Sequence, residues 1–117
     1  MKIMVGTTTD TEKEKKITEA QIQAALIERL ELGGKLIIRL NSGFAMGASG
    51  RRIKTAPPGT PDLLVLGQGG QHLFIEVKSP KGKLNSNQVQ MHQQLSELGH
   101  TVKIVRSMQD VEEVAPL

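Results

Sequence analysis

The chain has 117 residues and a formal net charge of +3, which suits one domain with a single hydrophobic core. It has no cysteine, which excludes disulfides and thiolate metal sites, and its three histidines lack the spacing of zinc ligands. No apolar run approaches the roughly 20 residues that a membrane helix needs, and no secretory signal is recognisable. We therefore expect a protein of the cytoplasm with no membrane partner.

The N-terminal part of the chain predicts an arm followed by a helix. Residues 1–17 are polar and charged, and we expect them to form a flexible arm before a domain over residues 18–117. Thr18 is expected to cap the first helix, with Gln21 as its capping-box partner, and Gly33 to end it.

The apolar positions of this helix recur at the helical period and predict its buried stripe: Ile22, Leu26 and Leu30. Glu19 lies three residues before this stripe, so the spacing places it on the core side of the first turn. A carboxylate there either complements the helix dipole or has a functional role.

A strand and a long connection follow. Residues 35–41 are rich in branched side chains and predict a strand, and residues 42–60 hold four glycines, a proline pair and the basic residues Arg51, Arg52 and Lys54. Loops of this length in compact domains are usually functional or disordered. We expect the basic side chains to contact a phosphate backbone; disorder or a short extra hairpin is the alternative.

Two apolar runs on either side of a glycine-rich turn at residues 67–71 predict a β-hairpin. Asp62 comes directly before the first run, and Glu76 and Lys78 end the second. Side chains alternate along a strand, so Glu76 and Lys78 share one face while Val77 packs on the other. Two carboxylates and a lysine at the ends of adjacent strands suit metal-dependent cleavage of a phosphodiester.

The C-terminal third predicts a helix, a strand and a short helix. Residues 86–98 form the predicted helix, which Gly99 ends. Its expected stripe consists of Met91, Leu95 and Leu98. Gln88 lies on the same face of the helix as this stripe. Its side-chain amide is expected either to reach the functional site on the sheet or to cap the start of the helix. Residues 101–106 predict a parallel strand reached by a right-handed crossover, and Ser107 begins the last helix.

The charge is concentrated in the middle of the chain. Between Lys35 and Ser96 there are eight basic residues and only two acids, Asp62 and Glu76. A basic surface around two carboxylates is expected to attract a polyanion and to hold a hard cation. A merely solvated basic face is the alternative.

These residues carry a resemblance to a known family. The order α-β-β-β-α-β, an α/β fold with a mixed sheet flanked by helices, resembles the VRR-NUC family of the PD-(D/E)XK nuclease superfamily, in its stand-alone viral or bacterial type. Pro61-Asp62 and Glu76-Val77-Lys78 match the superfamily motif. The resemblance implies a site for Mg²⁺ or Mn²⁺ with Asp62, Glu76 and the Val77 carbonyl as ligands, Glu19 assisting at the metal, and Lys78 and Gln88 as catalytic groups.

The resulting hypothesis is a structure-selective DNA endonuclease that acts as a homodimer on branched DNA such as four-way junctions. The expected DNA contacts are Arg39, Asn41, Arg51, Arg52, Lys54, Lys81 and Lys83. A flap or nicking nuclease, a non-catalytic DNA-binding module and a structural protein remain alternatives. The apolar edge of the second helix or residues 111–117 are the candidate dimer interfaces.

Overall fold

The structure is a computed structural model that describes residues 17–40, 44–46, 48–50, 52–54 and 56–116; the side chains of 44–46 and 52–54 are not described. Its helices and strands follow in chain order: α2 (Glu19–Leu32), β1 (Leu36–Arg39), β2 (Phe44–Met46), β3 (Arg52–Lys54), β4 (Leu63–Leu66), the 3₁₀ turn η1 (Gln68–Gly70), β5 (His72–Val77), α3 (Ser86–Glu97), β6 (Val102–Val105) and α4 (Met108–Val114).

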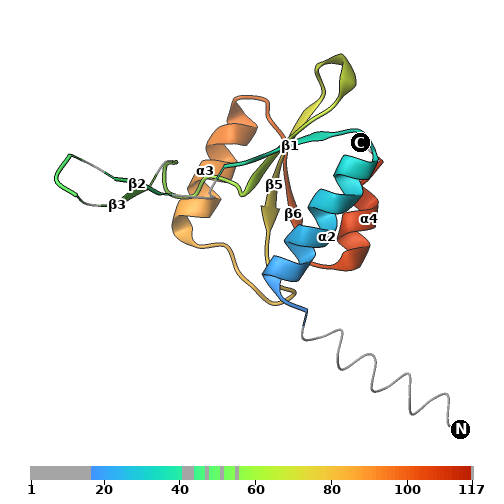
Figure 1. Ribbon diagram of the computed structural model, residues 1–117, viewed down its shortest axis with the longest axis horizontal. Helices are drawn as coiled ribbons and strands as arrows, with labels where there is room; N and C mark the ends of the chain where they lie inside the picture. The colour runs from blue at the N-terminus through green and yellow to red at the C-terminus, as the bar shows by residue number, and fades with distance from the viewer. Residues whose placement is uncertain (1–16, 41–43, 47, 51, 55, 117) are drawn as a thin grey trace, which may run out of the picture.

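A four-stranded mixed sheet forms the centre, with the strand order β1-β4-β5-β6. The β1–β4 and β4–β5 pairs are antiparallel and the β5–β6 pair is parallel. The predicted hairpin and the predicted parallel strand are therefore confirmed. Helices α2 and α4 lie together on one side of the sheet and α3 lies on the other, while the β2–β3 hairpin projects away from the body (Figure 1).

The core lies between α2 and the sheet, as the helical stripe predicts. Ile22, Leu26 and Leu30 are fully buried and pack with inward-facing residues of the strands. On β5 these are Leu73, Ile75 and Val77. Because side chains alternate along a strand, the residues between them, including Glu76, point to the opposite face, toward α3.

The ends of α2 follow the sequence signals. The Thr18 hydroxyl oxygen accepts from the Gln21 amide at 3.1 Å, and the Gln21 side chain accepts from the Thr18 amide at 2.9 Å, which completes the capping box. After the helix, Gly34 adopts a φ of +83°, a left-handed conformation that glycine adopts without strain. Helix α4 is capped by Ser107, as predicted.

One expectation for α3 is wrong: Leu98, predicted to lie on its buried stripe, is 75% exposed. The connection after β1 contains the short extra hairpin that was the alternative there, formed by β2 and β3, and contact of its basic side chains with a phosphate backbone stays a prediction. In the candidate interface segment 111–117, Val111 belongs to the hydrophobic core, because α4 packs on α2, so its side chain is not available to a dimer partner. Residues 1–16, assigned to the arm, lie outside the described residues.

Candidate active site

Asp62 and Glu76 meet across the β4–β5 pair. Leu63 lies opposite Ile75 in the antiparallel register, so Asp62, one residue earlier, comes opposite Glu76, one residue later. Opposed residues of an antiparallel pair project from the same face, with their Cβ atoms about 5 Å apart. The sheet register therefore brings the two acids of the sequence motif together.

The backbone around Asp62 fixes its carboxylate. Its Oδ2 accepts a hydrogen bond from the Val77 amide at 2.8 Å, which ties the side chain to the end of β5. Its own carbonyl accepts from the Leu40 amide at 2.8 Å, at the end of β1. Asp62 is thus held between two strands.

The segment that leads into Asp62 packs against the first turn of α3. Gly59 has a φ of +86°, and a Cβ atom at this position would lie 2.1 Å from the backbone oxygen of Asn87 in the first turn of α3. Only a residue without a side chain permits this approach. Gly59 of the Gly59-Thr60-Pro61-Asp62 motif therefore serves the packing that positions Asp62.

Glu76 is an ionisable residue in a buried place. It is 1% exposed, and burial raises its pKa from 4.5 to about 8. The negative charge of Asp62 and a hydrogen bond between the two carboxyl groups act in the same direction, as does Glu19 more weakly, whereas Lys78 opposes the rise. The fold thus places the partly buried Asp62 beside a carboxyl group that is shielded from water.

Helix α3 supplies hydrogen bonds to both oxygens of Glu76. Gln88 Nε2 donates to Oε2 at 3.4 Å, and His92 Nε2 lies 3.2 Å from Oε1. The Gln88 Oε1 atom also accepts from the Asn85 amide at 3.0 Å in a capping box. Both roles weighed for Gln88 are present, since its two amide atoms serve different partners.

His92 was missed by the sequence analysis, which considered the histidines only as zinc ligands. The signal was its spacing: His92 follows Gln88 by four residues and so lies on the same helix face. Burial lowers the pKa of His92 below 6.5, the positive charge of Lys78 lowers it further, and Asp62 opposes both. These effects favour a neutral imidazole at this position.

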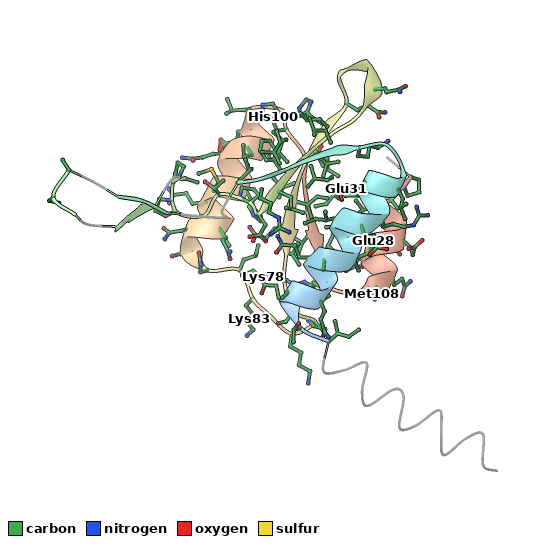
Figure 2. All side chains as sticks on the ribbon, viewed as in Figure 1. Glu28, Glu31, Lys78, Lys83, His100 and Met108 are labelled. Atoms are coloured by element: carbon green, nitrogen blue, oxygen red, sulfur yellow. The ribbon has the colours of Figure 1, made fainter. Side chains whose placement is uncertain are left out.

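The other predicted site residues lie around this pair. Glu19, which the spacing placed on the core side of the first turn, is exposed, and its charge raises the pKa of Glu76. Lys78 follows β5 directly, and its amide donates to the Val105 carbonyl at 2.9 Å. Figure 2 shows Lys78 and Lys83 at the end of the molecule where α2 begins.

The predicted DNA contacts are partly described. Arg39, Lys81 and Lys83 are exposed. The loop that carries the two lysines is held from β6, because Arg106 Nη1 donates to the Gly82 carbonyl. Asn41 and Arg51 lie outside the described residues. For Arg52 and Lys54 only the backbone, in β3, is described.

The donor set fits a hard divalent cation. Mg²⁺ usually binds one or two carboxylates and keeps several waters, and the Asp62–Glu76 pair supplies two. Within the described ranges, no group of three or more His, Cys, Asp or Glu residues is arranged to hold a metal. A cation bound here would relieve the repulsion that raises the pKa of Glu76.

The comparisons with known proteins identify the family. A family model described as VRR-NUC domain matches residues 17–109. The chain belongs to the VRR-NUC domain family. A solved structure described as a VRR_NUC domain superposes with a TM-score of 0.65 at 27% identity, over 86% of this chain and 97% of that one. A comparison with curated proteins gives no match.

Family membership makes this a nuclease-type domain that acts on DNA, on the small α/β fold that the sequence predicted. Helices long and apolar enough to cross a membrane are absent from the described part of the chain.

Proposed function

We propose that this VRR-NUC protein is a metal-dependent DNA endonuclease whose centre consists of Asp62, Glu76 and Lys78. The observation that carries the proposal is the pairing of the partly buried Asp62 with the buried Glu76, next to a lysine close enough to lower the pKa of Glu76. Buried carboxyl groups are rarely brought together for stability alone, because each disfavours the ionisation of the other.

The residues divide the chemistry of phosphodiester hydrolysis between them. Asp62 and Glu76, with the Val77 carbonyl, would hold Mg²⁺ or Mn²⁺, which supplies Lewis-acid stabilisation and a more acidic bound water. Lys78 places a positive charge where negative charge develops on the phosphoryl oxygens and orients the attacking water. Gln88 steadies Glu76 from α3, and Glu19 adds negative charge at the rim of the site.

The test is cleavage of labelled DNA with Mg²⁺, Mn²⁺ or EDTA. Glu76→Gln and Lys78→Ala should abolish cutting and leave the fold intact by circular dichroism. Lys103→Ala is the matched control, since Lys103 is an exposed lysine of β6 outside the site. Full activity in EDTA, or in either variant, would contradict a metal nuclease. DNA binding by the wild-type protein without any cleavage would favour the non-catalytic module.

We further propose that the substrate is branched DNA and that the working unit is a homodimer. One chain carries one centre, and two centres related by a two-fold axis could cut both strands of a four-way junction. Val89 and Leu98 are 51% and 75% exposed on the α3 side, which supports the apolar edge of that helix as an interface.

Sedimentation with and without a four-way junction tests this arrangement, together with cleavage of junction, flap and duplex DNA. Paired cuts by a dimer are expected. A strict monomer that nicks flaps would support the flap or nicking alternative instead.

A further inference from the structure

Glu76 is the buried member of the carboxylate pair. Besides the hydrogen bond that it shares with Asp62, its side-chain contacts come from one helix, α3. Gln88 and His92 are one turn apart on α3, and each lies against a different oxygen of Glu76, at 3.4 Å and 3.2 Å. A Glu76 carboxylate that binds a cation is ionised and only accepts hydrogen bonds, so in that state the contact with His92 requires an Nε2–H donor on the imidazole.

The two helix residues are not equivalent. Gln88 is also bound to the Asn85 amide and so belongs to the cap of α3. His92 makes its hydrogen bond to Glu76, at the shorter of the two distances, and its side chain is 14% exposed. A ring packed to this degree has few alternative rotamers, so the position of its Nε2 atom is fixed by the seat of α3 on the sheet.

A glutamate side chain has three rotatable bonds, and a ligand for a small cation must hold one orientation. Donors that orient metal-binding side chains tune metal affinity, and their loss typically weakens it about 10- to 100-fold. At Glu76 water cannot do this, because the side chain is 1% exposed. The orientation of its carboxylate therefore depends on its protein partners, and the nitrogen donors among them come from α3.

We propose that His92 is the positioning residue of this centre: its Nε2–H holds Glu76 Oε1 so that Glu76 and Asp62 face one cation, and it determines cation affinity without contacting DNA. The inference rests on the proposed metal-nuclease function and adds a residue to it. It predicts that removing the His92 donor lowers the affinity for the cation and leaves the affinity for DNA unchanged.

Three substitutions of His92 separate the hydrogen bond from the packing. His92→Gln places an amide donor at a similar reach, His92→Leu fills the space without a donor, and His92→Asn stays polar but is too short to reach Glu76. The control is His100→Leu, which removes another partly buried histidine, bonded to His72 at 3.0 Å at the far end of the sheet.

Cation affinity is measured without DNA by titration calorimetry with Mn²⁺ and by the Mg²⁺-dependent rise of the melting temperature. DNA affinity is measured by anisotropy in EDTA, and the rate of cleavage is measured across Mg²⁺ concentrations. His92→Leu and His92→Asn should weaken cation binding roughly 10- to 100-fold, the range typical of such orienting residues. Saturating Mg²⁺ should restore most of the rate, and DNA affinity should not change.

His92→Gln should recover cation affinity to within a few-fold of wild type, and His100→Leu should leave it unchanged. Wild-type cation affinity in both His92→Leu and His92→Asn overturns the positioning role, as does a His92→Gln protein as weak as His92→Leu. If the wild-type protein neither binds Mn²⁺ nor cleaves DNA, the proposed nuclease function fails, and the positioning role fails with it.

Discussion

The buried carboxyl group of Glu76 should make the stability of the metal-free protein fall as the pH rises. In the unfolded chain Glu76 ionises near its ordinary pKa of 4.5, whereas in the folded protein its pKa is about 8. Between these values the folded state binds more protons than the unfolded state, so each rise in pH favours unfolding. Below pH 4.5 both states are protonated and the penalty disappears; above pH 8 it is complete.

The magnitude follows from the two pKa values. A difference of one pH unit inside this window corresponds to about 1.4 kcal/mol, so at pH 7 the buried group destabilises the fold by about 3 kcal/mol. Glu76→Gln removes the ionisation and keeps a similar shape. Relative to wild type, this variant should gain stability by about 1.4 kcal/mol for each pH unit between 5 and 8.

The assay is urea unfolding of both proteins in EDTA at several pH values. Titration of His92 largely cancels, because both proteins contain it, and a constant offset from the new amide does not affect the slope. For a domain of this size, 3 kcal/mol corresponds to a melting-temperature difference of more than about 10 °C. A stability difference that stays flat from pH 5 to 8 would refute a raised pKa at Glu76. Saturating Mg²⁺ should reduce the slope, because a cation favours the ionised carboxylate.

Three further predictions concern packing and DNA binding. Gly59→Ala should destabilise the fold by more than about 2 kcal/mol, because the new methyl group meets the α3 backbone; Gly69→Ala, with a similar φ of +71° and open space, should lose only about 1 kcal/mol. In urea unfolding, Leu26→Ala should lower the free energy of unfolding by about 2–5 kcal/mol, whereas Leu98→Ala, at an exposed position, should lower it by less than about 0.5 kcal/mol. Equal decreases in the two variants would contradict the observed burial. Charge reversal of the basic connection should weaken DNA binding and flatten the dependence of log affinity on log salt in anisotropy titrations, whereas Lys103→Glu should not. The residues to reverse are Arg51, Arg52 and Lys54.

The sequence by itself determined the elements that depend on local periodicity. The capping box at Thr18 and the stripe through Leu26 are signals within a single helix, and both are found in the structure. The strand alternation correctly placed Val77 in the core and Glu76 on the opposite face. The pairing of Asp62 with Glu76 could also be predicted from the sequence, because a short glycine-rich turn limits the register of a hairpin.

Only the tertiary structure decided what surrounds Glu76. Whether His92 meets it depends on where α3 sits across the sheet, and helix spacing gives the face of a residue but not its partner. Leu98, the C-cap residue of α3, is exposed, although the helical period placed it on the same stripe as Met91 and Leu95. Glu19 is exposed and still acts on the pKa of Glu76, because an electrostatic effect depends on distance in space, which no sequence period encodes.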